Sequence, residues 1–324
     1  METTMQMQLA AAAAAALLLA TGFTTAASAA QTESRGVGWG CPSKCGNVTI
    51  DYPFGIGENC ALNRDFNLNC DGQDSIAKLW TTTHSHNSQT QKRESQITAI
   101  DYEKGQMDFV MPVSSFCYTE SGKNLSVKPD WLNVPNAFTV SSKANTFFTV
   151  GCNTYGLFRS SKGGSKFSTG CVQICDRAPK KKDVGNCSGF GCCQTNIPAI
   201  GLRDIGAEAR SLPFDKKVWK FNNCSYSFVA KNGWYDFIPE DLAHLRFDSA
   251  PLVINWAAGN QNQTCKSVDK DNGYVCGLNT ECVETEFRCG YRCKCKDGYT
   301  GNPYRLHGCQ SKDFLLYFLK IHSH

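Results

Sequence analysis

Apolar and polar residues alternate along this chain only over short runs. Residues 138–140 and 147–150 are examples, and Gly, Asn and Pro separate such runs from one another. Alternation with a period of two is typical of β-strands, and the separating residues are those that form turns. No heptad, long amphipathic helix or simple repeat is visible. The pattern therefore predicts a small, β-rich and loop-rich fold.

The first thirty residues have a different pattern. Residues 9–20 are an almost unbroken run of Ala and Leu, and small residues follow up to Ala30. This order is typical of a secretory signal peptide, which we expect over residues 1–30, although Glu2 stands where such signals usually carry a basic residue. The apolar run of about a dozen residues is shorter than the roughly 20 that a membrane-spanning helix needs.

All nineteen cysteines follow that segment. An exported chain passes through an oxidising compartment, so we expect these cysteines to form disulfides. Zinc is the alternative, because Cys-x3-Cys occurs twice, but no histidine follows a cysteine pair at zinc-finger spacing. We therefore expect no metal and no cofactor. The odd count leaves one thiol for an intermolecular bond or a free, reactive group.

Glycosylation motifs and charge agree with export. The formal net charge is +4, and it becomes +5 without residues 1–30, whose only charged residue is Glu2. This mild excess permits an anionic partner without demanding one, and nothing indicates nucleic acid. Five Asn-x-Ser/Thr motifs are candidate glycosylation sites, and the two with Cys as the middle residue, at Asn186 and Asn223, are weaker candidates than the other three. The five are Asn47, Asn124, Asn186, Asn223 and Asn262.

Two polar stretches divide the remaining chain into three blocks. Residues 160–182 contain Gly163-Gly164 and three successive lysines, and we expect a loop or linker there that Cys171 and Cys175 pin. Residues 257–263 are the second break. Six cysteines lie between residues 41 and 152, six between 171 and 224, and seven between 265 and 309. These counts predict that the first two blocks close internally, in pairings left open, and that the spare thiol is in the third.

The third block resembles an EGF-like domain. Six of its cysteines are separated by ten, five, ten, one and thirteen residues, and the Cys-x-Cys pair is followed by a Gly-Tyr-Thr-Gly sequence at 298–301. Residues 283–292 contain no Asp or Asn, so calcium binding is not expected. The resemblance implies the pairs Cys265 with Cys282, Cys276 with Cys293 and Cys295 with Cys309, and it leaves Cys289 as a free or intermolecular thiol.

Longer motifs extend the resemblance to most of the chain. Residues 41–46 read CPSKCG, 50–57 read IDYPFGIG, and 189–198 read GFGCCQTNIP. With FNLNC at 66–70 and CSYSFV at 224–229, they closely resemble the extracellular part of plant wall-associated receptor kinases. The resemblance implies a galacturonan-binding-like domain at 31–158, a companion cysteine-rich domain at 159–256, an EGF-like domain at 257–309 and a tail at 310–324. The tail has too few apolar residues to span a bilayer, and no kinase motif is present.

The resemblance implies an extracellular protein of the cell wall that binds pectin or oligogalacturonides. Basic side chains would pair with the galacturonate carboxylates, and aromatic rings would cover the apolar faces of the sugars. The alternative is that most of the basic residues only solvate the surface and that the aromatic ones, together with Phe54, are core. The candidates are Lys44, Arg64, Lys78, Lys92, Arg93, Lys104, Lys123 and Lys128, with Tyr52, Trp80 and Trp131 as platforms.

Two other functions stand beside pectin binding as hypotheses: pectin hydrolysis and interaction with another protein. A pectin hydrolase needs converging carboxylates, and the chain has neither an Asp-Asp pair nor a Gly-His-Gly sequence, so we expect no enzyme. The EGF-like block or Cys289 would instead recruit cell-wall proteins or a co-receptor. If the gene product continues into a membrane helix and a kinase, its place is the plasma membrane.

Overall fold

The computed structural model describes residues 40–57, 59–72, 78–85, 88–128, 130–181, 187, 189–259, 263–268, 273–287 and 290–313, without the side chains of 83–93 and 126–128. The expected signal peptide, most of the tail, Asn186, Asn262 and Cys289 lie outside these residues.

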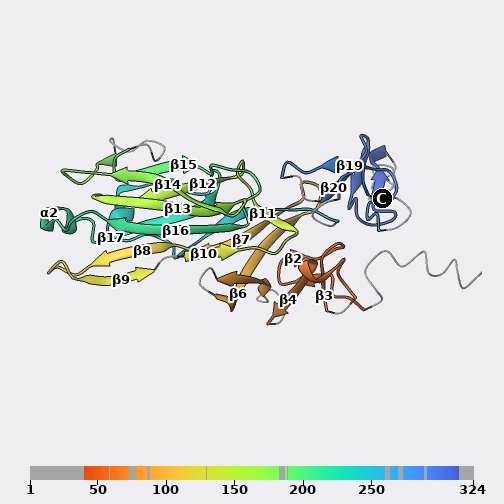
Figure 1. The fold of residues 1–324 in the computed structure, drawn as a ribbon, viewed down its shortest axis with the longest axis horizontal. Helices are drawn as coiled ribbons and strands as arrows, with labels where there is room; N and C mark the ends of the chain where they lie inside the picture. Colours follow the sequence, from red (N-terminus) through yellow and green to blue (C-terminus); the bar gives the residue numbers. More distant parts are fainter. Residues whose placement is uncertain are drawn as a thin grey trace, which may run out of the picture.

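Two mainly antiparallel sheets form the main body of the molecule (Figure 1). The larger, 11-stranded sheet has the order β11-β18-β7-β6-β5-β10-β16-β13-β14, with β4 and β3 attached at β5. Its strands are β3 (Gly55–Ile56), β4 (Asn67–Asp71), β5 (Lys78–Ser85), β6 (Ser88–Asp101), β7 (Gln106–Pro112), β10 (Asp130–Asn133), β11 (Phe138–Val140), β13 (Thr154–Lys162), β14 (Ser165–Gln173), β16 (Asp204–Ser211) and β18 (Ser249–Trp256).

The smaller sheet has five strands in the order β15-β12-β17-β8-β9. Two 3-10 helices, η1 (Arg64–Phe66) and η4 (Pro239–Leu242), and the one-turn helix α2 (Lys216–Trp219) lie in its connections and those of the larger sheet. The five strands are β8 (Ser114–Tyr118), β9 (Asn124–Lys128), β12 (Asn145–Val150), β15 (Cys192–Asn196) and β17 (Cys224–Lys231).

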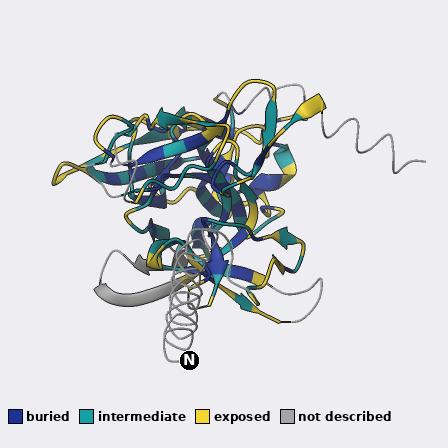
Figure 2. Cartoon of the chain, turned by 90° about the vertical axis from the view of Figure 1, so that its right-hand side faces the viewer, coloured by how far each residue is buried: buried dark blue, intermediate teal, exposed yellow. Residues whose placement is uncertain are grey.

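Alternating burial shows why these residues form strands. On β7 and β13 every second residue is buried, because successive side chains of a strand point to opposite faces of the sheet. Phe158 of β13 is fully buried and contacts Phe147 of the smaller sheet, with ring centroids 5.8 Å apart. The buried residues lie in the interior of the molecule (Figure 2). The predicted β-rich, disulfide-rich class is confirmed.

The expected loop at residues 160–182 is wrong for most of its length. β13 and β14 pair from Thr154 opposite Gln173 to Lys162 opposite Ser165. Gly163 and Gly164 join them with φ angles of 58° and 81°. A two-residue hairpin turn needs positive φ at both positions, which glycine adopts without steric cost. The glycine pair is therefore the turn of a long hairpin, and the boundary expected at residue 158 falls inside β13.

Two disulfides join the first two cysteine blocks to each other, contrary to the counting argument. Cys117 pairs with Cys224, and these residues are direct cross-strand neighbours on β8 and β17. Cys152 pairs with Cys175, which also crosses the expected division. The other pairs there are Cys41–Cys60, Cys45–Cys70, Cys171–Cys193 and Cys187–Cys192. Strands from both blocks share both sheets, so residues 41–256 form one folded body.

A small segment at the N-terminal side, here called the N-terminal knob, comprises residues 41–71. Its Cys41–Cys60 and Cys45–Cys70 disulfides hold the β1–β2 hairpin (Lys44–Cys45 and Val48–Thr49) beside β3 and β4. Phe54 and Phe66 are fully buried and meet edge to face at 5.1 Å. Phe54 is thus core, as the alternative interpretation of the aromatic residues expects.

Residues 265–311, here called the C-terminal unit, fold around three disulfides. The pairs are Cys265–Cys282, Cys276–Cys293 and Cys295–Cys309, which are those implied by the EGF-like resemblance. Two hairpins complete the unit: β19 (Thr280–Glu284) with β20 (Tyr291–Cys295), and β21 (Tyr299–Gly301) with β22 (Cys309–Ser311). No helix within the described residues is long and apolar enough to cross a membrane.

Candidate functional site

The part of the large sheet formed by β4, β5 and β6 presents one face to solvent. Leu79 and Ile97, which oppose each other, are 1% exposed and belong to the core. Trp80 follows Leu79 and therefore points to the other face, where it lies opposite Asn69 and Gln96. We call this surface, made by Asn69, Asp71, Lys78, Trp80 and Gln96, the Trp80 face.

The indole of Trp80 is held in place on this face. Its Nε1 donates a hydrogen bond of 2.6 Å to Oδ2 of Asp71, and Asp71 lies opposite the exposed Lys78 in the register of β4 and β5. An oriented aromatic ring beside a cation and an amide provides the groups that bind an acidic sugar: an apolar surface, a charge partner and hydrogen-bond donors.

Other basic candidates lie on neighbouring elements. Lys44 on β1 and Arg64 in η1 are both exposed on the N-terminal knob. Lys92 and Arg93 lie on β6 opposite His84 and Thr83, and their side chains are outside the described ones.

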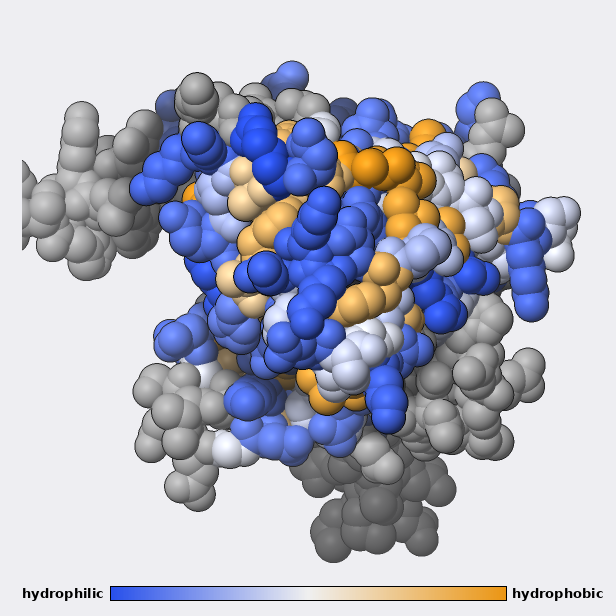
Figure 3. All heavy atoms as spheres, turned by 90° about the vertical axis from the view of Figure 1, so that its left-hand side faces the viewer, coloured by the Kyte–Doolittle hydropathy of each residue, from blue (hydrophilic) through white to orange (hydrophobic). Residues whose placement is uncertain are grey.

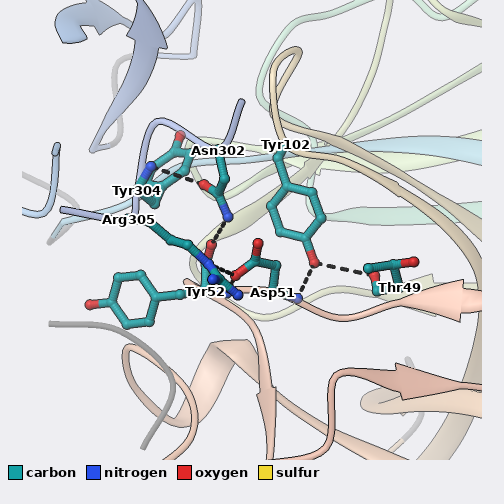
Figure 4. A network of polar contacts seen from close by, with 7 residues as sticks. All are labelled: Thr49, Asp51, Tyr52, Tyr102, Asn302, Tyr304 and Arg305. Atoms are coloured by element: carbon teal, nitrogen blue, oxygen red, sulfur yellow. Dashed lines mark hydrogen bonds and ion pairs between the residues drawn. The ribbon is translucent and has the colours of Figure 1, made fainter. Parts of the chain in front are cut away.

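The residues around Tyr52 form a junction between the N-terminal knob and the C-terminal unit (Figure 4). The Tyr52 carbonyl accepts a hydrogen bond of 2.7 Å from Nδ2 of Asn302. Arg305 donates through Nε to Oδ1 of Asp51. Tyr52, a predicted sugar platform, is half-buried, and its main chain takes part in this structural contact.

Tyr102, on the turn after β6, ties the junction to the large sheet. Its hydroxyl accepts a hydrogen bond of 2.6 Å from the Asp51 backbone N–H and faces the Thr49 carbonyl at 3.4 Å. Burial raises the pKa of Tyr102 above its ordinary value, and the nearby Asp51 carboxylate acts in the same direction. The phenol therefore stays protonated at neutral pH.

Aromatic packing makes the junction continuous with the core. Trp256 of β18 meets Phe54 of the N-terminal knob at 5.1 Å and Tyr304 of the C-terminal unit at 5.0 Å between ring centroids. Trp256 and Tyr304 are at most 1% exposed. Nearby, the Lys104 carbonyl accepts a hydrogen bond from Arg292, while the Lys104 ammonium is 3.2 Å from Asp101. Lys104, a candidate for carboxylate binding, thus already contacts Arg292 and Asp101.

Two further candidates lie at the other end of the body. Lys123 precedes β9 in the turn of the β8–β9 hairpin, far from the N-terminal knob (Figure 1). Lys128 ends β9, and its side chain is outside the described ones. Figure 3 shows this end as hydrophilic surface interrupted by apolar patches, where the exposed large apolar side chains include Leu125 of β9 and Phe214 before α2. The structure does not bring Lys123 together with the Trp80 face.

Trp131 lies on the same large sheet but on other strands, with residues that the sequence alone did not single out. On β13 and β16, Arg159 and Arg210 both bind Glu208, whose side chain is 8% exposed. The alternation of Tyr155, Leu157 and Arg159 with buried residues is a signal of a solvent-facing strand face.

The fold is a disulfide-stapled, two-sheet body with an appended three-disulfide unit. Residues 41–111 match the family described as "Wall-associated receptor kinase galacturonan-binding". This stretch contains the N-terminal knob, the Trp80 face and all of β7 except Pro112.

Relatives in Arabidopsis thaliana extend the similarity over most of the chain. Wall-associated receptor kinase 2 is 37% identical over 83% of this chain and 34% of its own length. Wall-associated receptor kinase 3 is 33% identical over 84% of this chain and 36% of its own. The chain thus spans about a third of the length of the curated relatives it matches. The resemblance to wall-associated receptor kinases, predicted from the sequence, is confirmed.

Proposed function

We propose that this chain is an extracellular pectin-binding ectodomain, and that the Trp80 face takes demethylated galacturonan. The match of residues 41–111 to a galacturonan-binding family carries the proposal. Trp80 and Lys78, both predicted from the sequence, lie on the solvent-facing side of that stretch. The sugar ring would stack on the indole, and a carboxylate would pair with the ammonium, without any catalytic step.

The disulfides and sequons support the extracellular part of the proposal. Asn47, Asn124 and Asn223 are exposed, so each is accessible as a glycosylation acceptor. Eighteen of the nineteen cysteines are paired, which requires an oxidising compartment. We assign the C-terminal unit to the EGF-like class on its disulfide order and its two hairpins. It is a candidate contact for a cell-wall protein or co-receptor.

Binding to immobilised polygalacturonate at low and high salt tests the sugar-binding proposal. Retention at low salt that falls at high salt is expected, because exposed ion pairs are screened. Trp80→Ala and Lys78→Glu should each weaken retention. Trp234→Ala and Lys296→Glu are matched controls, since Trp234 is a 41%-exposed aromatic packed on Phe247 and Lys296 is exposed on the C-terminal unit. Absence of retention at low salt, or equal loss in the controls, contradicts the proposal.

A further inference from the structure

A second surface lies on the outer side of the large sheet, outside the stretch that matches the galacturonan-binding family. The register places Trp131 of β10 opposite Gly206 of β16, and Gly206 opposite Arg159 of β13. Residue 158 points into the core, so Arg159 points away from it. Glu208 and Arg210 follow Gly206 by two and four residues and share its face.

The indole of Trp131 lies across the backbone of Gly206. A Cβ atom added to Gly206 would be only 2.5 Å from Cε3 of the ring. Any other residue at this position would push the ring away, so the glycine allows a flat aromatic surface on the sheet. Tyr155 lies opposite Arg210 on the same face and is half-buried.

A nearly buried carboxylate holds two arginines beside these rings. Glu208 Oε2 is 2.7 Å from Nη2 of Arg159, and Oε1 accepts from Nε and Nη2 of Arg210. The arginine side chains remain 39% and 42% exposed, against 8% for Glu208. Two cations and one anion leave one positive charge facing solvent. We call Trp131, Tyr155, Arg159, Glu208 and Arg210 the Arg–Trp face.

The next row of the sheet does not remove this positive charge. The Asp204 carboxylate lies 3.3 Å from the Ser161 hydroxyl, and Ser161 lies opposite Lys166. Asp204 contributes one negative charge and Lys166 one positive charge, so the two charges cancel. The Arg–Trp face therefore keeps its net positive charge.

The arginines keep hydrogen-bond capacity for a second anion. A guanidinium has five N–H donors in a planar fork, and Glu208 engages only part of each fork. Because Glu208 fixes both guanidiniums, a carboxylate would meet donors that are already oriented.

We propose that the Arg–Trp face is a second binding surface for an acidic sugar chain, with the arginines holding a uronate carboxylate and Trp131 covering the apolar side of the sugar. This inference rests on the proposed galacturonan binding and extends it beyond residues 41–111. A simple anion would use the arginines alone, whereas the ring beside them selects an anionic group carried on a sugar.

The two faces belong to one sheet, which gives the proposal a geometric consequence. β5 and β10 pair through His84 and Asn133, so Trp80 and Trp131 are offset by six residues along the strands. That offset is about 20 Å at the usual rise per residue. A long galacturonan chain that engages both faces gains affinity from the second contact, and a short oligomer that reaches only one does not.

Calorimetric titration of the full chain with long polygalacturonate at low salt tests the proposal. The double variant Arg159→Lys/Arg210→Lys keeps the charges and the pairing with Glu208 but removes the planar forks. We expect it, and Trp131→Ala, to weaken binding about tenfold or more. Arg177→Lys is the control, because Arg177 is exposed and stacks on Phe190 at 4.9 Å. Carboxyl-reduced polygalacturonate should not distinguish the arginine variant from the wild type.

The outcomes separate this inference from the proposed function. If Trp80→Ala weakens binding while the arginine and Trp131 variants bind as the wild type does, the Arg–Trp face is only a structural ion pair and the inference is overturned. If the wild type does not bind polygalacturonate, both proposals fail. Near-ultraviolet circular dichroism checks the fold of each variant. Should Trp131→Ala not fold, the arginine variant decides.

Discussion

At the scale of single residues, buried charges depend on partners that are close in space. Asp241 is fully buried, and Arg246 donates to both of its oxygens at 2.8 and 3.1 Å. The Tyr235 hydroxyl donates to Oδ2 at 3.0 Å. The hydrogen bond to Asp241 raises the pKa of Arg246, and burial raises the pKa of Tyr235. Arg246 and Tyr235, together with the Ile238 N–H, thus compensate the hydration that the Asp241 carboxylate loses on burial.

Removal of Arg246 should therefore be costly. Arg246→Ala leaves the Asp241 charge buried with the Tyr235 hydroxyl as its remaining side-chain donor, and we expect a loss of about 2–4 kcal/mol in the free energy of unfolding. Urea denaturation measures the change. Arg246→Lys, which retains a cation, should lose less, and an equal loss in both variants would contradict the ion-pair explanation.

High pH should weaken the junction through its phenols. Burial raises the pKa of both Tyr102 and Tyr304 in the folded chain, whereas the unfolded value is about 10. Above pH about 10 the unfolded state releases protons that the folded state retains. The contribution of these phenols to the free energy of unfolding is therefore fully present below this pH and is lost as the pH rises further. Thermal unfolding between pH 8 and 11 measures the slope. Tyr102→Phe should reduce the slope, and an unchanged slope would show that Tyr102 does not contribute.

Cys289 should be the one cysteine without an intramolecular partner. Nine disulfides use the other eighteen cysteines of the chain. Under denaturing, non-reducing conditions we expect one titratable thiol per chain, or a disulfide-linked dimer on electrophoresis. Cys289→Ser should abolish whichever is seen. More than one thiol per chain would contradict the disulfide set of the structure.

At the scale of elements, cross-links and turns decide which strands become neighbours. The Cys117–Cys224 disulfide joins β8 to β17 across a sequence separation of 107 residues, whereas Cys187–Cys192 spans a separation of 5. A disulfide that closes a longer loop removes more conformational entropy from the unfolded chain, in the loop-entropy account. The Cys117–Cys224 disulfide should therefore contribute more to the free energy of unfolding than Cys187–Cys192 does.

Their removal gives a matched comparison. Cys117→Ser/Cys224→Ser should lower the free energy of unfolding by about 2–4 kcal/mol, because the long loop opens in the unfolded state. Cys187→Ser/Cys192→Ser should lower it less. Chemical denaturation of both double variants measures the difference. A larger loss from the short loop would contradict the entropic explanation and point to packing at Cys187 instead.

At the scale of the whole molecule, one core connects parts that the sequence separates. Phe54, Trp256 and Tyr304 belong to the same buried cluster, although they come from the N-terminal knob, β18 and the C-terminal unit. Ala258 also pairs with Tyr291 through backbone hydrogen bonds of 2.9 Å in both directions. The C-terminal unit is thus packed on the body and does not hang from a linker.

This shared core predicts how fragments behave. A fragment of residues 40–158 contains β10 without its partner β16, and β7 without β18. We expect this fragment to lack a cooperative unfolding transition, because strand edges and apolar faces that are buried in the full chain are exposed to solvent in it. Residues 40–313 should unfold in one cooperative transition. Thermal unfolding followed by circular dichroism checks both, and a cooperative transition of the short fragment would show that the division at residue 158 marks an independent domain.

Local patterns of the sequence determined the β-rich class, the resemblance to wall-associated receptor kinases and the spacing of the six cysteines in the C-terminal unit. These features follow from residues near one another in the chain, where period and spacing can be read directly. Trp80 and Trp131 were candidate platforms because the resemblance implies a sugar ligand and aromatic rings can cover the apolar faces of sugars.

Only the tertiary structure decided which distant residues meet. The sequence does not encode locally that Cys117 pairs with Cys224, or that Arg159 and Arg210 bind Glu208. Strand pairing in this fold joins residues far apart in the chain, and the register sets which side chains share a face. The grouping of charges and rings into binding surfaces is therefore a property of the folded sheet, not of the order of residues.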